Sequence, residues 1–194
     1  KDYRNFFISG LIFVIGSSAF PIALAISILD NGGTATDLGL ILASRVFAGT
    51  IFTLVGGVWS DRLPRKWIMV SADAFRGLVA LVLVVISSSN MPLWAIGLLV
   101  FLMGLGDAFG APAGAAIVPS LLPDHLLPAG NVARGIVAKI GTIVGPGVGG
   151  ISVALIGADY TFAVTAVAFL VGTSLLLGIT EAPIQGQVEV KPSF

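Results

Sequence analysis

Long apolar runs alternate with short polar stretches along most of this chain. Six such runs cover residues 6–29, 38–59, 67–89, 93–118, 132–157 and 160–180. A helix needs roughly 20 residues to cross the hydrocarbon core of a bilayer, and every run reaches about that length. The pattern therefore predicts an all-α membrane protein. Residues 1–180 are expected to form a bundle of six transmembrane helices, and residues 181–194 a polar tail or linker.

The composition supports a surface that faces lipid. Hydrophobic residues make up 56% of the 194 residues and charged residues 10%, whereas a soluble domain carries about 25% charged residues. Ten basic residues balance ten acidic ones, so no charge excess favours nucleic acid as a partner. The lack of cysteine and the presence of one histidine, His125, predict no metal site and no cofactor.

The distribution of cations predicts the orientation. The segments assigned to one side of the membrane contain Lys1, Arg4, Arg62, Arg65, Lys66 and Lys191. The opposite loops contain Asp30, Asp37 and Asp159 and neither lysine nor arginine. Because cytoplasmic loops of membrane proteins are enriched in lysine and arginine, both termini are expected in the cytoplasm, with the chain in a bacterial-type plasma membrane.

The densest charge cluster of the first 120 residues connects the second and third runs. It reads Gly57-Val58-Trp59-Ser60-Asp61-Arg62-Leu63-Pro64-Arg65-Lys66. The segment resembles the signature Gly-x-x-x-Asp-Arg-x-Gly-Arg-Lys between helices 2 and 3 of the major facilitator superfamily. The matching positions are Gly57, Asp61, Arg62, Arg65 and Lys66, and Pro64 replaces the second glycine. The resemblance implies a cytoplasmic gating motif.

A second motif lies within the fifth run and reads Gly141-Thr142-Ile143-Val144-Gly145-Pro146-Gly147-Val148-Gly149-Gly150. It is similar, at every fixed position, to the motif Gly-x-x-x-Gly-Pro-x-x-Gly-Gly that is typical of helix 5 in antiporters of that superfamily. The positions that carry the similarity are Gly141, Gly145, Pro146, Gly149 and Gly150.

The spacing of these glycines has a physical meaning of its own. Gly141, Gly145 and Gly149 recur every four residues, so they share one helix face on which another helix can pack closely. Pro146 removes one backbone hydrogen bond and is expected to bend the helix. We expect the glycine face to meet a second bundle and slide against it. The alternative is a face that only packs helices together.

The resemblance covers nearly the whole chain, as the N-terminal six-helix half of a twelve-helix transporter. The segment 119–131 also looks like the loop between helices 4 and 5 of macrolide-efflux and siderophore exporters. Two positions depart from the drug-antiporter pattern. Leu102 stands where many of these proteins have an arginine in helix 4, and Pro119-Ser120 replaces an acidic residue that often ends that helix.

The function implied by this resemblance is secondary active efflux of amphipathic drugs or similar small molecules, by proton-coupled antiport and alternating access. The implied partners are the lipid bilayer, the substrate, protons and a second six-helix half, in the same chain or a separate one. Two alternatives stay open. One is a half-size protein that works as a homodimer, and the other is a structural or regulatory bundle that does not transport.

Charged residues fall inside the predicted spans, where a charge costs about 2.5–3.5 kcal/mol on insertion scales. Five of them are Arg45, Asp73, Arg76, Asp107 and Lys139. Such residues pair with each other or face a cavity, so Asp107, Arg45, Arg76 and Lys139 are candidates for the proton or substrate pathway. We expect Asp107 to be the protonatable group, held by one of the cations.

Two alternatives for these charges stay open. Asp107 with Arg76 or Lys139 could form a permanent pair that only joins helices. Asp73 and Arg76, three residues apart, could simply pair with each other. Arg45 has no acidic residue within one turn, which favours a position facing a cavity.

An enzymatic function is not expected. A serine-type membrane hydrolase needs a base beside its nucleophile, and the lone histidine, His125, is expected in a solvated loop. The phosphate-binding motif Gly-x-x-x-x-Gly-Lys-Ser/Thr is also absent from the sequence, which argues against transport driven by ATP within this chain.

Overall fold

The computed structural model describes residues 2–87 and 92–181, and every regular element in these two ranges is helical. The long helices are α1 (Asp2–Asp30), α2 (Ala35–Arg62), α3 (Arg65–Ser87), α4 (Leu93–Ala116) and α6 (Leu127–Leu177). Two short helices, α5 (Val118–Leu121) and η1 (Asp124–Leu126), connect α4 to α6. The prediction of an all-α protein is confirmed for the described residues. Part of the predicted third span and the predicted tail lie outside them.

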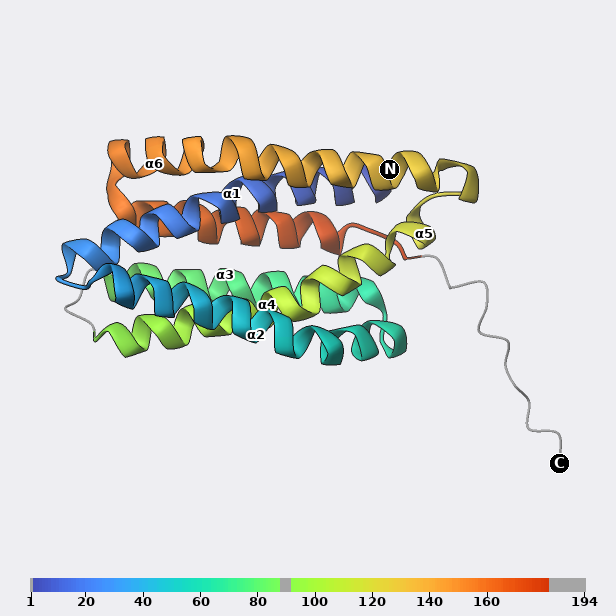
Figure 1. Ribbon diagram of the computed structural model, residues 1–194. Coiled ribbons are helices and arrows are strands. Elements are labelled where there is room, and N and C mark those ends of the chain that lie inside the picture. The colour runs from blue at the N-terminus through green and yellow to red at the C-terminus, as the bar shows by residue number, and fades with distance from the viewer. Residues whose placement is uncertain (1, 88–91, 182–194) are drawn as a thin grey trace, which may run out of the picture.

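By length and composition, five helical segments of the described chain are apolar enough to cross a membrane: α1 to α4 and the segment 124–177 that contains α6. α6 is not one straight rod. Its backbone leaves helical geometry at Gly157, where φ is +82°, and Figure 1 shows the chain turning back there into a second, antiparallel arm. Glycine adopts this left-handed conformation at little cost, which explains the residue at the turn.

The ends of α2 follow from local chemistry. Thr34 and Asp37 form a capping box at its start: the Asp37 N–H donates to the Thr34 hydroxyl, and the Thr34 N–H donates to the Asp37 carboxylate at 2.8 Å. At its end, Pro64 disfavours helical geometry at Leu63. The connection between α2 and α3 is therefore Leu63 and Pro64, shorter than the predicted turn, and Asp61 and Arg62 belong to the last turn of α2.

The long helices run along one common direction (Figure 1). α1 packs mainly on the two arms of α6, α2 packs on α4, and α3 contacts α4 and α6. The N-terminal end, the connection between α2 and α3, and α5 lie at one end of the bundle. The connection between α1 and α2 and the Gly157 turn lie at the other end.

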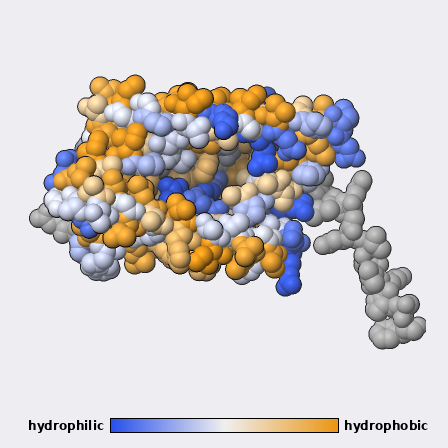
Figure 2. All heavy atoms as spheres, viewed as in Figure 1, coloured by the Kyte–Doolittle hydropathy of each residue, from blue (hydrophilic) through white to orange (hydrophobic). Residues whose placement is uncertain are grey.

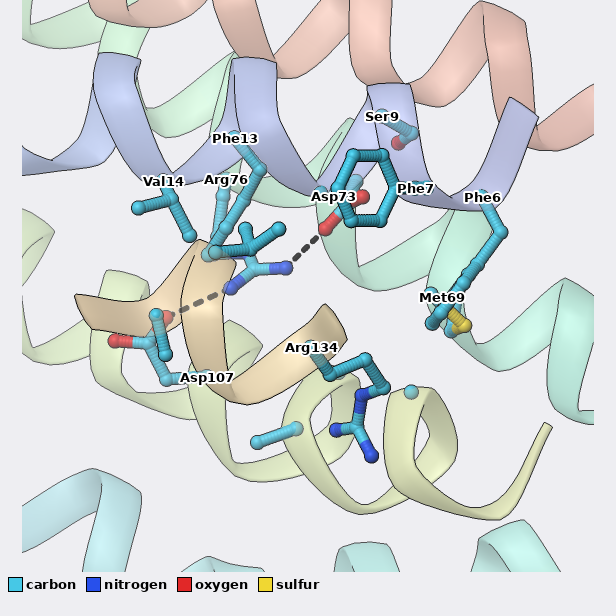
Figure 3. A pocket seen from close by; sticks show the side chains of 16 residues that line it. Phe6, Phe7, Ser9, Phe13, Val14, Met69, Asp73, Arg76, Asp107 and Arg134 are labelled. Atoms are coloured by element: carbon cyan, nitrogen blue, oxygen red, sulfur yellow. Dashed lines mark hydrogen bonds and ion pairs between the residues drawn. The ribbon is translucent and has the colours of Figure 1, made fainter. Parts of the chain in front are cut away.

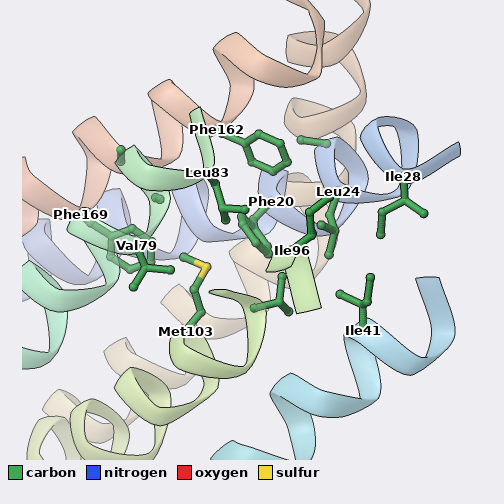
Figure 4. Close-up of a cluster of buried hydrophobic side chains, with 14 of the residues drawn as sticks. Phe20, Leu24, Ile28, Ile41, Val79, Leu83, Ile96, Met103, Phe162 and Phe169 are labelled. Carbon is green, nitrogen blue, oxygen red and sulfur yellow. The ribbon is translucent and has the colours of Figure 1, made fainter. Parts of the chain in front are cut away.

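The main core contains side chains from every long helix, including Phe20, Leu24, Val79, Met103 and Phe169, all at most 5% exposed (Figure 4). Buried hydroxyl groups add polar links inside it. Ser9 donates to the carbonyl of Gly172 at 3.1 Å, and Thr165 donates to the carbonyl of Gly16 at 3.0 Å. These bonds fix α1 on the second arm of α6, since a buried hydroxyl needs a partner.

The glycine face of the first arm of α6 is occupied within this chain. Gly141, Gly145 and Gly149 are buried, and a Cβ atom on them would meet residues 14–22 of α1. The expectation that a helix packs closely on this face is confirmed. The expectation that the face is free to slide on a second bundle is wrong, because α1 covers it.

The other two residues of the second motif, Pro146 and Gly150, do not belong to this packed face. Pro146 is exposed, and the helix continues through it, so the sharp change of direction in α6 occurs at Gly157. Gly150 has open space around its Cα atom. The motif therefore divides into three packed glycines and two positions on other faces of the helix.

Candidate functional site

A cavity of about 370 Å³ lies among α1, α3, α4 and the first arm of α6. Its walls are mostly apolar and aromatic, with four charged side chains. They consist of Phe6, Phe7, Ser9, Gly10, Phe13, Val14, Met69, Asp73, Arg76, Asp107, Gly110, Ala111, Gly114, Arg134, Val137 and Ala138. The face seen in Figure 2 is hollowed near its middle, where hydrophilic residues show among apolar surroundings. An apolar cleft with a few polar groups is the usual form of a small-molecule site.

A chain of ion pairs borders this cavity and joins three helices. Asp107 of α4 accepts hydrogen bonds from Arg45 Nε of α2, at 2.8 Å, and from Arg76 Nη1 of α3, at 2.7 Å. Arg76 also binds Asp73, one turn earlier on its own helix. Two arginines thus balance two aspartates, as charges inside a membrane require.

Arg76 is the most enclosed member of the chain, with its side chain 5% exposed. Its guanidinium carbon lies 4.5 Å from the centre of the Phe13 ring and 5.1 Å from that of Phe169, which are distances of cation–π contacts. α4 makes room for this side chain with two glycines, because a Cβ atom on Gly106 or Gly110 would lie about 2.9 Å or less from Arg76. The position of Arg76 is therefore fixed from several sides.

Asp107 differs from Asp73 in its access to the cavity. Its side chain is 30% exposed, compared with 8% for Asp73. Figure 3 shows both carboxylates reaching the Arg76 guanidinium from different helices. Asp107 thus holds two arginines and also faces the cavity, whereas Asp73 is enclosed beside Arg76.

Arg45 and Lys139 have different surroundings. Arg45 pairs with Asp107 and lies 5.4 Å from the centre of the Phe20 ring, and it does not line the cavity. Lys139 lies on the outer face of α6, in a shallow apolar groove with Ile136, Ile140 and Ile143. Within the described ranges Lys139 makes no ion pair, so the alternative Asp107–Lys139 pair does not form.

The residues of the first motif gather at the end of the bundle where α2 meets α3. Asp61 and Arg62 are exposed, and Gly57 has open space around it, whereas its neighbour Gly56 packs on the backbone of Ala108. Arg65 is half-buried, and its Nε atom has no hydrogen-bond partner among the described residues.

Lys66 ties this region to the end of α6. Its backbone N–H donates to Glu181 Oε2 at 3.1 Å, and its Nζ atom donates to the carbonyl of Leu177 at 2.8 Å. The carboxylate thus caps the first turn of α3, and the ammonium group binds a free carbonyl at the end of α6. Pro119 and Ser120 stand where drug antiporters often have an acidic residue, and here Glu181, which follows α6, contacts Lys66 of the motif.

Sequence reasoning missed three residues of this region: Glu181, Arg134 and Tyr3. Glu181 falls in the predicted tail, and neither Arg134 nor Tyr3 is among the candidate site residues that the sequence suggests. The Tyr3 hydroxyl donates to the carbonyl of Gly130 at 2.9 Å, one turn before Arg134. The repeated glycines around Asp107 are a sequence feature that could have indicated the space on α4 that Arg76 occupies. His125 is exposed in η1, and the described residues contain no cluster suited to hold a metal ion.

The bundle of helices long and apolar enough to cross a membrane, with a chain of ion pairs between them, defines a multi-pass membrane protein. The sequence model of the Major Facilitator Superfamily matches residues 6–193, so the chain belongs to this superfamily.

Several characterised proteins are similar to parts of it. The Multidrug efflux pump Tap of Mycolicibacterium fortuitum is 31% identical over 161 residues, which cover 79% of this chain and 39% of that protein. The Macrolide efflux protein A of Streptococcus pyogenes is 28% identical over 115 residues, 59% of this chain and 28% of that protein. The Enterobactin exporter EntS of Salmonella choleraesuis (strain SC-B67) is 26% identical over 195 residues, 98% of this chain and 46% of that protein. The chain thus spans less than half the length of these relatives.

Proposed function

We propose that this chain is one six-helix half of a secondary transporter that exports amphipathic small molecules from the cytoplasm by proton-coupled antiport. Membership of the Major Facilitator Superfamily and the similarity to three exporters support this reading. In it, the two arms of α6 are separate spans, which with α1 to α4 gives six, and both termini are cytoplasmic in a bacterial-type plasma membrane. A second half, from the same chain, another chain or a second copy, completes the transporter.

The observation that carries the proposal is the Asp107 carboxylate, shared by Arg45 and Arg76 at the wall of the cavity. Protonation of Asp107 removes the negative charge that holds both arginines. Arg76 then keeps Asp73, whereas Arg45 has no other acidic partner in the part of the chain that the structure describes. The link between α2 and α4 weakens, and a proton arriving at one carboxylate changes how two helices are held.

Replacement of Asp107 by asparagine tests this mechanism. The amide keeps the shape of the side chain but neither titrates nor carries charge. We expect Asp107→Asn to abolish efflux of an amphipathic fluorescent dye driven by a pH gradient. The rate of dye exchange measured in the absence of a gradient should stay the same. Asp124→Asn, in the exposed η1, is the matched control. Unchanged efflux with unchanged pH dependence in Asp107→Asn would remove the coupling role.

A bundle that does not transport is the competing function, because a balanced chain of ion pairs also serves to join helices. The two are separated by measuring dye efflux for the chain alone and for the chain produced together with a second half. Efflux only in the pair, or only in a dimer of this chain, supports the proposed half-transporter. Absence of efflux from every assembly, with correctly folded protein, favours the structural bundle.

A further inference from the structure

Three arginines and two aspartates lie in the wall of the cavity or directly behind it, so one cation has no carboxylate there to pair with. Of the cavity's four charged residues, Asp73, Arg76 and Asp107 belong to the chain of ion pairs, which Arg45 completes and neutralises. Arg134 is left over. Across residues 2–87 and 92–181 no carboxylate pairs with it, and no side chain or carbonyl accepts a hydrogen bond from it. Arg134 is therefore a positive charge at the cavity that takes part in no ion pair within the described chain.

Arg134 lies apart from the paired charges. It lies on the first arm of α6, one turn after Gly130, whose carbonyl binds the hydroxyl of Tyr3. Figure 3 shows its guanidinium group away from Arg76, with no interaction drawn to either carboxylate. The side chain is half-buried in a mostly apolar wall. Leaving such a cation unpaired inside a membrane is unfavourable, and an anion beside it would remove that cost.

The chemistry of the wall indicates what kind of anion fits. Phe6, Phe7 and Phe13 and the flexible side chain of Met69 offer apolar and aromatic contact. A guanidinium group binds the two oxygens of a carboxylate, sulfonate or phosphate in a planar, bidentate manner. The cavity therefore combines a site for an oxyanion with a surface for a flat apolar body.

We propose that the cavity selects amphipathic molecules that carry an oxyanion over neutral or cationic ones, and that Arg134 is the residue that recognises the anion. The inference rests on the proposed export function, because it names the class of molecule that the transporter would carry. The preference for an anion is argued from the unpaired charge of Arg134. The same chemistry occurs in anionic lipid head groups, so the test must distinguish an exported solute from a lipid.

Three probes that share one fluorophore provide the test: dansyl sulfonate, which is anionic, dansyl amide, which is neutral, and dansylcadaverine, which is cationic. Their dissociation constants are measured on the chain in the assembly isolated from membranes, in phosphatidylcholine nanodiscs. We expect the sulfonate to bind the unmodified protein most tightly. Arg134→Gln should weaken the sulfonate about tenfold, since it removes a hydrogen bond assisted by charge, and leave the amide unchanged.

Two further variants keep the test specific. Arg134→Lys retains the positive charge but not the bidentate geometry, so it should recover part of the preference for the sulfonate, and its folding shows that the bundle tolerates change at this position. Lys139→Gln removes a cation from the outer face of the same helix, five residues later, and should change none of the three constants. Equal weakening of all three probes by Arg134→Gln, or equal effects of Arg134→Gln and Lys139→Gln, would overturn the proposal.

A second set of nanodiscs contains phosphatidylglycerol. Sulfonate affinity that is unaffected by this lipid supports a solute as the occupant. Affinity that falls with phosphatidylglycerol in the unmodified protein, but not in Arg134→Gln, identifies a lipid head group there and overturns the assignment to a solute. Efflux of dansyl amide without any preference for the anion would reject the charge inference alone. Efflux of no probe, with the binding preference intact, would reject the export function alone.

Discussion

Arg45 on α2 and Asp107 on α4 form an ion pair with 2.8 Å between Nε and Oδ2, although 62 positions separate them in the sequence. The other oxygen of the same carboxylate binds Arg76 of α3. One aspartate thus holds two neighbouring helices to α4. Asp107 therefore contributes both to the stability of the bundle and to its proposed response to protons.

Arg76 is expected to be the most costly member of this chain to remove. Arg76→Gln leaves Asp73 in the core without a cation, and loss of one partner of a buried ion pair costs about 3–5 kcal/mol of unfolding free energy. The free energy of unfolding, measured in mixed detergent micelles, checks this value. Arg45→Gln should cost less, because both members of its pair are more exposed.

The double variant Asp73→Asn, Arg76→Gln provides the control for that experiment. It removes the uncompensated carboxylate together with the arginine, so part of the lost stability should return. A double variant no more stable than Arg76→Gln would show that the packing of Arg76 on Phe13 and Phe169, and not its charge, is what the core requires.

The glycines of the second motif are expected to respond very differently to a larger side chain. Gly145 is buried against Ser18 of α1, whereas Gly147, two residues later, has open space around it. Gly145→Leu should therefore lower the free energy of unfolding by about 1–3 kcal/mol or more through overpacking. Gly147→Leu should change it little. Equal effects of both would contradict the close contact between α1 and α6.

The sequence alone predicts the helical class because each apolar run is long enough for one span. It does not predict which cation meets Asp107. Arg45, Arg76 and Lys139 all fall inside apolar runs, and length along a helix leaves the rotation about its axis undetermined. Helices that are apolar on nearly every side provide no amphipathic pattern to settle that rotation. Only the packed structure shows Lys139 on the outer face.

The glycine face illustrates the same limit at another site. The four-residue spacing of Gly141, Gly145 and Gly149 predicts that a helix packs there, and α1 does. The spacing does not identify which helix it is, and the expected second bundle was the wrong partner. In the same way, the contact between Lys66 and Glu181 joins residues 115 positions apart and has no local signal in the sequence.

The cap that Glu181 places on α3 should protect the start of that helix. Glu181→Ala removes the acceptor for the Lys66 N–H, so amide hydrogen exchange should speed up in the first turn of α3. Exchange in the middle of α3 should stay the same. Glu181→Gln keeps an oxygen acceptor and should behave close to the unmodified protein. Unchanged exchange in Glu181→Ala would show that the first turn of α3 does not depend on this contact.

The proposed topology can be tested by chemical labelling, because the chain contains no cysteine and every introduced one reports alone. Three positions are informative: Asn31, between α1 and α2, Asp159, beside the Gly157 turn, and Asp124, in η1 at the other end of the bundle. In intact cells, a maleimide that does not cross membranes should label Asn31→Cys and Asp159→Cys. It should label Asp124→Cys only after permeabilisation.

Labelling of Asp124→Cys from outside would invert the orientation. Labelling of Asp159→Cys only after permeabilisation would mean that the two arms of α6 are not separate spans. The cation distribution predicts which side is cytoplasmic, and the reversal at Gly157 favours a sixth span, so the three labels must agree for the proposed topology to hold.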